Sequence, residues 1–121
     1  MSNNEEVGLK NLRHFTSEIG LDAVDKLREN SPELAKYITE FAFGTIYELP
    51  TLSDREKICI TISSLVSQGE VEALQVHFHS AKNIGLTNEE IKGILLHCIP
   101  YTGFPKVLKA MQLFDNMFPN K

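Results

Sequence analysis

Apolar residues recur at intervals of three and four along most of the chain, which is the spacing of helices with one buried face. The pattern predicts helices over about 3–18, 21–30, 32–44 or slightly beyond, 54–67, 70–83, 88–98 and 104–117. Gly20 and Gly85 are predicted to end helices, and residues 100–105 (Pro-Tyr-Thr-Gly-Phe-Pro) to form a compact break. No stretch combines alternating apolar positions with hairpin turns. We therefore predict an all-α fold of six or seven helices.

Three helix starts are marked by capping sequences. Ser31-Pro32-Glu33 places a hydroxyl at the N-cap, proline at the first helical position and an acid in the first turn. Ser53 with Glu56, and Thr87 with Glu90, have the spacing of a capping box. These signals predict where the helices begin more sharply than the apolar pattern does.

The size of the chain predicts one domain. It has 121 residues, of which 42% are hydrophobic and 23% charged, as in an ordinary soluble domain. We expect a single domain over residues 1–121, with a polar and acidic arm at about residues 1–8.

Charge and cysteine content exclude several classes of function. The net charge of −4 comes without a long basic run, which argues against nucleic-acid binding. No apolar stretch approaches the ~20 residues of a membrane span, and the start of the chain has no apolar core like that of a signal peptide. Cys59 and Cys98 lie on separate predicted helices and form neither a disulfide framework nor a zinc-ligand pair. We expect a reduced, cytoplasmic protein without a membrane partner and without a metal site.

The helix predicted over 70–83 carries two histidines in different environments. At 100° per residue, His77 lies about 70° from the centre of the apolar face, and His79 about 130° from it. His77 is therefore predicted to border the buried face, and His79 to be solvated. Only His77 is placed to have its pKa changed by burial and by its neighbours.

Three polar side chains share one edge of the preceding helix. Glu56, Cys59 and Ser63 follow one another at spacings of three and four along the border of the apolar face. If the two helices pack antiparallel across the turn at 67–69, this edge could meet His77. A carboxylate, a thiol and an imidazole would then share one cleft suited to acid–base chemistry.

Each of these residues also has a structural interpretation. Glu56 is explained by its place in a capping box, and Cys59 by packing as a small apolar residue. A histidine in the position of His77 is often only hydrogen-bonded to a neighbour, and His97 is interpreted as a surface residue. Spacing alone leaves both interpretations open.

Four segments together resemble the carboxymuconolactone decarboxylase family. They are residues 52–57 (LSDREK), residues 77–91 (HFHSAKNIGLTNEEI), residues 101–105 (YTGFP) and, before them, residues 41–47 (FAFGTIY). Their order and spacing match the family pattern over roughly residues 30–118.

The resemblance implies a fold, an assembly and a reaction. It implies the all-helical fold of alkylhydroperoxidase D and a ring-shaped homo-oligomer, a hexamer or trimer. It also implies conversion of 4-carboxymuconolactone to an enol-lactone of 3-oxoadipate, without a metal or organic cofactor. His77 falls on the family's histidine position, and Glu56 on the acidic position of its Arg-Glu motif.

One departure from the wider superfamily bears on redox chemistry. Its peroxidase branch has a Cys-x-x-Cys pair before the histidine, where this chain has Glu70 and Ala73. Cys59 and Cys98 do not rebuild that pair. A thiol peroxidase that cycles an intramolecular disulfide is therefore not expected.

The sequence thus predicts a small enzyme that decarboxylates a carboxylated lactone or a similar small-molecule acid. His77 is the candidate acid–base group, and Glu56 would orient it or carry protons. Additional candidate lining residues are Cys59, Tyr101, Gly103 and Glu70. Two alternatives stay open: a thiol redox protein that uses Cys59, and a non-catalytic ring that binds small ligands.

Overall fold

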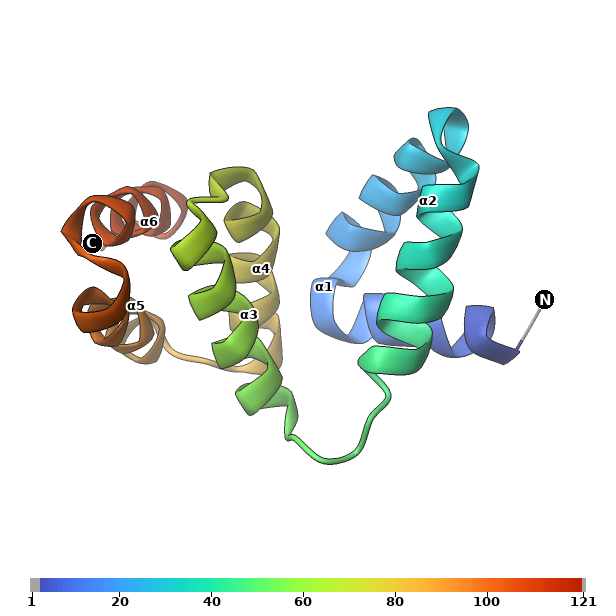
Figure 1. Ribbon diagram of the computed structural model, residues 1–121, viewed down its shortest axis with the longest axis horizontal. Helices are drawn as coiled ribbons and strands as arrows, with labels where there is room; N and C mark the ends of the chain where they lie inside the picture. Colours follow the sequence, from blue (N-terminus) through green and yellow to red (C-terminus); the bar gives the residue numbers. More distant parts are fainter. Residues whose placement is uncertain (1–2, 121) are drawn as a thin grey trace. The chain divides into compact units, whose positions relative to one another are not determined.

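Most of the chain that the structure describes, residues 3–120, is helical (Figure 1). This computed structural model contains α1 (Asn3–Asn30), α2 (Pro32–Lys36), η1 (Tyr37–Ile46), α3 (Asp54–Gln68), α4 (Val71–Ile84), α5 (Asn88–Thr102) and α6 (Phe104–Met117). Over residues 3–120 there is no strand, and α2 runs directly into η1, which confirms the predicted all-α fold. None of the helices in this range is long and apolar enough to cross a membrane.

Contacts within the chain define two compact units, residues 1–53 and residues 54–121. The first unit contains α1, α2 and η1, and the second contains α3 to α6. The single domain predicted over residues 1–121 would require these two units to pack together, and it stays a prediction. The segment predicted as a polar arm, about residues 1–8, is helical from Asn3 onward, and residues 1 and 2 lie outside the described range.

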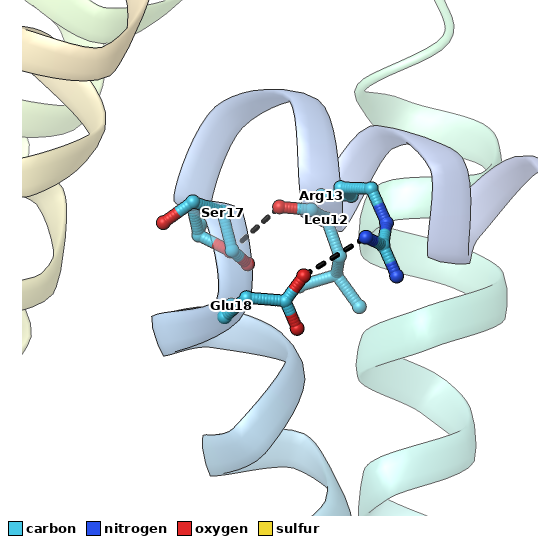
Figure 2. Close-up of polar contacts among 5 residues, drawn as sticks. Leu12, Arg13, Ser17 and Glu18 are labelled. Atoms are coloured by element: carbon cyan, nitrogen blue, oxygen red, sulfur yellow. Dashed lines mark hydrogen bonds and ion pairs between the residues drawn. The ribbon is translucent and has the colours of Figure 1, made fainter.

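In the first unit, α1 is broken at Ser17, where the backbone leaves the helical conformation (Figure 2). The φ of 55° and ψ of −148° at Ser17 suit glycine, and such conformations cost other residues roughly 1–3 kcal/mol. Next to the break, the Thr16 hydroxyl donates to the Leu12 carbonyl at 2.6 Å. An ion pair of 2.8 Å joins Arg13 to Glu18 across it (Figure 2). Two helical segments therefore cover residues 3–30, as predicted.

The predicted helix end at Gly20 is wrong. Gly20 is buried inside the second half of α1, and a Cβ atom there would lie 1.8 Å from Thr16 Oγ1. Glycine at this position provides space for the Thr16 side chain, and the change of chain direction occurs at Ser17.

The backbones of α1 and η1 approach each other closely. A Cβ atom at Gly8 would lie 1.9 Å from the Thr39 carbonyl oxygen, and one at Gly44 would lie 2.4 Å from the Asn4 carbonyl oxygen. The core of this unit consists of buried apolar residues: Leu12, Val24, Ala35 and Phe43. The first two turns of α1 are therefore packed against η1.

The helix after Ser31 begins as predicted but differs in detail. Ser31 is the N-cap and Pro32 opens the helix, as predicted, although the Ser31 side chain makes no capping hydrogen bond. From Tyr37 the helix widens into a π-helix, and beyond its end the Tyr47 N–H donates to the Ala42 carbonyl, five residues earlier, at 2.9 Å. Its end at Ile46 agrees with the predicted end near Tyr47.

In the second unit, the helices pack around fully buried apolar side chains: Ile58, Ile62, Val66, Leu74, Phe78, Ile91, Leu95 and Phe114. Gly85 ends α4 with a left-handed φ of 111°, as predicted. The capping box of α5 is also confirmed: Glu90 N–H donates to Thr87 Oγ1 at 3.1 Å, and Thr87 N–H donates to Glu90 Oε1 at 2.9 Å.

The break predicted at residues 100–105 is confined to Gly103. α5 continues through Pro100 to Thr102, and Gly103, with a φ of 96°, separates it from α6. Proline removes one N–H, which would otherwise bond to the carbonyl of Leu96 four residues earlier. Leu96 lies on an exposed turn, where water can replace the missing donor. The prediction of a longer break was therefore wrong.

Candidate functional site

In the second unit, α3 and α5 run in the same direction alongside each other. Near their N-terminal ends, the Arg55 guanidinium forms an ion pair with Glu90. Near their C-terminal ends, the Ser67 and Thr102 hydroxyl oxygens are 3.1 Å apart. Both contacts join residues that are 35 positions apart, so one offset relates facing residues along the pair.

Two cavities between these helices together form what we call the α3–α5 groove. Their volumes are about 520 and 490 Å³, the size of cavities that hold small organic ligands. Three residues line both cavities: Ser63, His97 and Cys98. The first cavity is also lined by Arg55, Cys59, Leu86, Glu90, Gly93 and Ile94, and the second by Ile60, Ser64, Ser67, Tyr101 and Thr102.

Both cysteines line the first cavity of the groove. Cys59 is half-buried, Cys98 is buried, and both are free thiols. Burial raises the pKa of the Cys98 thiol, which keeps it protonated and weakly nucleophilic. The two residues are far apart in the sequence, and the parallel packing of α3 and α5 brings them to one cavity.

His77 lies on α4 between the exposed surface and the core, as predicted. The ring is half-buried, directly before the fully buried Phe78. His77 Nδ1 is buried and has no hydrogen-bond partner within the described residues. Burial lowers the pKa of the His77 imidazole below its ordinary value of 6.5, so the ring is neutral at neutral pH.

The environment of His79 is less open than predicted. The ring is half-buried and contacts Phe118 edge to face, with 5.5 Å between the ring centroids. The chain after α6 therefore covers part of the face that the helical pattern had assigned to solvent.

The groove contains part of the predicted site. Cys59 lines its first cavity and Tyr101 its second, where the Tyr101 ring is 82% exposed and lies 6.0 Å from His97. Neither of these two cavities is lined by Glu56 or His77. A shared cleft for Glu56, Cys59 and His77 therefore stays a prediction.

The remaining predicted residues lie at helix ends. Glu56 is exposed in the first turn of α3. Glu70 is exposed at the N-cap of α4. Gly103 joins α5 to α6.

Sequence reasoning missed His97, Cys98 and Arg55 as groove residues. His97 is exposed, as predicted, and Cys98 is buried, and the structure also places both on the groove wall. These residues could have been found from the offset of 35 positions that relates facing residues of α3 and α5. That offset can be recognised only once the two helices are known to be parallel. Over residues 3–120, no three His, Cys, Asp or Glu side chains are grouped so that they could hold a metal ion.

Comparison with known proteins assigns the family. Residues 32–116 match the model of the carboxymuconolactone decarboxylase family. The chain is 28% identical to 4-carboxymuconolactone decarboxylase of Acinetobacter baylyi over 120 residues, which cover 96% of this chain and 90% of that protein. It is 34% identical to nitrosuccinic acid decarboxylase of Metarhizium robertsii over 74 residues, which cover 61% of this chain and 52% of that protein. The helical fold and these matches show that the chain belongs to the carboxymuconolactone decarboxylase family, whose named relatives here are decarboxylases.

Proposed function

We propose that the protein decarboxylates a small carboxylated lactone or a similar acid, with His77 as the acid–base group and without a metal or organic cofactor. The observation that carries this proposal is the His77 imidazole. It is half-buried, its Nδ1 lacks a hydrogen-bond partner in the described structure, and it is neutral at neutral pH. Such a ring can accept a proton without first being deprotonated by solvent, and its N–H can donate a hydrogen bond.

The reaction requires control of one electron pair and one proton. When the bond to the carboxylate carbon breaks, CO₂ leaves and the electron pair passes into the conjugated lactone, which becomes an enolate. The neutral His77 ring would donate a hydrogen bond from its N–H to the developing charge, and a proton taken up from water then completes the product. Glu56 would orient His77 or carry protons. Tyr101, beside the Gly103 turn, would supply a second hydrogen-bond donor, and Glu70 would line the same site.

Release of CO₂ tests this proposal directly. The purified protein should convert 4-carboxymuconolactone, or nitrosuccinate as the second candidate acid, with one CO₂ released for each molecule consumed. Nitrosuccinate is included because one relative is named for it. Absence of CO₂ from both acids, with a folded protein, would contradict the proposal.

The two thiols favour one second candidate function, a peroxide-reducing protein. Peroxide would oxidise the Cys59 thiolate to a sulfenic acid as the O–O bond breaks, and a proton from solvent would let the second peroxide oxygen leave as water. Cys98, in the same cavity, could then displace a second water to form a disulfide. The raised pKa of Cys98 opposes this second step, because the attacking species is the thiolate.

Replacement of Cys59 separates the two functions. We expect Cys59→Ser to retain decarboxylation within about threefold, because serine preserves size and no bond to sulfur is needed. Turnover of substrate and of hydrogen peroxide would both be measured. Peroxide reduction that is lost in Cys59→Ser but kept in His77→Gln would favour the redox function instead.

We also propose that the protein forms a homo-oligomer, a trimer or hexamer. Large apolar side chains are exposed near the end of α5 and the start of α6: Leu96, Tyr101, Phe104 and Leu108. An isolated chain rarely leaves such a group in contact with water. Light scattering at micromolar concentration should give three or six times the 13.6 kDa chain mass. A stable monomer would refute this proposal.

A further inference from the structure

α1 changes direction at a residue whose side chain disfavours the backbone conformation that it adopts. Ser17 has a φ of 55° and a ψ of −148°, in a region that glycine occupies readily and other residues rarely. Such a conformation persists only where the surrounding structure imposes it. Contacts elsewhere in the first unit must therefore hold the bend at Ser17.

The sequence around the bend is suited to a straight helix instead. Residues 13–19 contain neither proline nor glycine, the two residues that most weaken a helix. In a straight helix, which turns by about 100° per residue, four apolar side chains would lie within about 80° of one another: Leu9, Leu12, Ile19 and Leu27. A straight α1 would thus have one continuous apolar face, whereas Ile19 is 40% exposed in the bent helix.

The bend is held by contacts of residues 3–16, which we call the N-terminal segment, with η1 and the residue after it. The Asn11 side chain donates to the Phe43 carbonyl at 2.8 Å, 32 positions along the chain. Phe15 packs edge to face against Tyr47, with 4.8 Å between the ring centroids. Because these partners are remote in the sequence, the same contacts can form between two chains as well as within one.

An ion pair across the bend resists straightening only weakly. Arg13 Nη1 and Glu18 Oε1 lie on either side of Ser17 and are 2.8 Å apart, and the two side chains are 68% and 66% exposed (Figure 2). Side chains three or four residues apart are neighbours on a straight helix, but side chains five apart are not. Straightening therefore separates this pair, at little cost because exposed ion pairs contribute little to stability.

We infer that Ser17 is a strained hinge through which two copies of the chain exchange their N-terminal segments. α1 straightens, and each N-terminal segment then makes its Asn11 and Phe15 contacts with η1 and Tyr47 of the other copy. The exchange restores these contacts, since the same surfaces meet, and it also relieves the conformation of Ser17. Pairing of two chains costs translational and rotational freedom, so the exchanged form increases with protein concentration.

Cross-linking across a second contact of the N-terminal segment tests the exchange. Asn11 Nδ2 donates to Glu48 Oε2 at 3.1 Å, so Asn11→Cys and Glu48→Cys would be combined, with Cys59→Ser and Cys98→Ser to remove the native thiols. The protein is equilibrated at micromolar to millimolar concentration, treated with a short bismaleimide and run on a denaturing gel. A link within one chain gives a monomer band, and a link between exchanged chains gives a covalent dimer.

We expect a covalent dimer whose fraction rises with protein concentration, after correction for the dimer that forms with Asn11→Cys alone. Trimers or hexamers that associate without exchange give the monomer band, because each link then stays within its own chain. A monomer band alone at every concentration would overturn the exchange, and so would a dimer fraction that does not depend on concentration.

Two substitutions at the hinge should act in opposite directions. Ser17→Gly relieves the bent form and should lower the dimer fraction about tenfold or more. Ser17→Ala favours the straight helix and should raise it about twofold or more. Ala23→Gly is the matched control, because residue 23 is exposed and helical in both forms, and it should change the fraction less than about twofold. Equal dimer fractions in Ser17→Gly and Ser17→Ala would overturn Ser17 as the hinge.

The strain at the hinge can also be measured without cross-linking. In urea denaturation of dilute protein, Ser17→Gly should raise the midpoint, whereas Ala23→Gly should lower it, because glycine weakens a regular helix. A midpoint for Ser17→Gly at or below that of the parent protein would show that Ser17 stores no strain and would overturn the inference.

Discussion

His77→Gln is expected to lower the turnover of the decarboxylated substrate by about 100-fold or more while the protein stays folded. Glutamine keeps a polar side chain of similar length but cannot exchange a proton near neutral pH. His79→Gln is the matched control, since it lies two residues away on the same helix and contacts Phe118 instead. Steady-state rates give the effect, and circular dichroism verifies that both variants are folded. Equal losses in the two variants would contradict the assignment of His77.

The pH dependence provides a second check on His77. Because burial lowers its pKa below 6.5, the neutral ring persists below that pH, and kcat/KM should fall only at more acidic values. The stability of the folded protein is expected to change with pH in the same direction as kcat/KM. Between the lowered folded pKa and the ordinary unfolded one, the unfolded state binds the extra proton, so stability falls as pH drops through 6.5. His77→Gln should remove this part of the pH dependence, and an unchanged profile would show that His77 is not its source.

Gly8→Ala is expected to destabilise the first unit by about 3 kcal/mol. The added Cβ would lie 1.9 Å from the Thr39 carbonyl oxygen, and both groups belong to helix backbones that cannot move independently. α1 and η1 would have to separate, which exposes the core around Leu12 and Phe43. Urea denaturation followed by circular dichroism, at one fixed protein concentration, measures the change.

Gly93→Ala is the control for this substitution. Gly93 lies inside α5, and apart from its chain neighbours and the nearby backbone of its own helix no atom lies within 4 Å of the position of an added Cβ. Alanine there should raise stability by about 0.5–1 kcal/mol, because glycine loses more conformational freedom on folding. A Gly8→Ala variant as stable as the parent protein would show that the two helices do not approach as closely as described.

The sequence predicted correctly those helix ends that are stabilised by residues close to one another in the chain. The Thr87–Glu90 capping box and the left-handed Gly85 are satisfied by residues within a few positions, so sequence spacing was sufficient. The prediction at Gly20 failed because glycine serves two purposes, to turn the chain and to provide space, and sequence does not distinguish them. The break at Ser17 was not predicted, because serine is not the residue that a φ of 55° favours.

The α3–α5 groove could not be predicted from local sequence patterns, because these patterns do not show which helices pack against each other. The helical wheel placed Cys59 and Ser63 correctly on an edge of α3, but it could not say which helix that edge faces. A cleft shared with His77 of α4 stays a prediction, and the residues that share these two cavities with Cys59 and Ser63 come mainly from α5, among them His97. Which neighbour a helix edge meets is set by the packing of all four helices of the second unit.

The parallel arrangement of α3 and α5 has an electrostatic consequence. Each helix has a dipole with its positive pole at the N-terminus, so parallel packing places like poles side by side at both ends. The sequence offsets this with acids in both first turns, Asp54 and Glu56 on α3 and Glu89 and Glu90 on α5. At the other end, Lys106 Nζ donates to the Ser67 carbonyl at 2.8 Å.

The two ends of this pair therefore respond differently to acid. Because the Thr87 N–H chiefly lowers the pKa of the Glu90 carboxyl, Glu90 keeps its charge until the solution is strongly acidic, and the ion pair with Arg55 is lost when that charge is lost. The contact at the other end joins two hydroxyl groups, Ser67 and Thr102, which do not titrate. Acidification thus favours separation of α3 from α5 at their N-terminal ends, and the pair opens from the Arg55 end while it stays closed at Ser67 and Thr102.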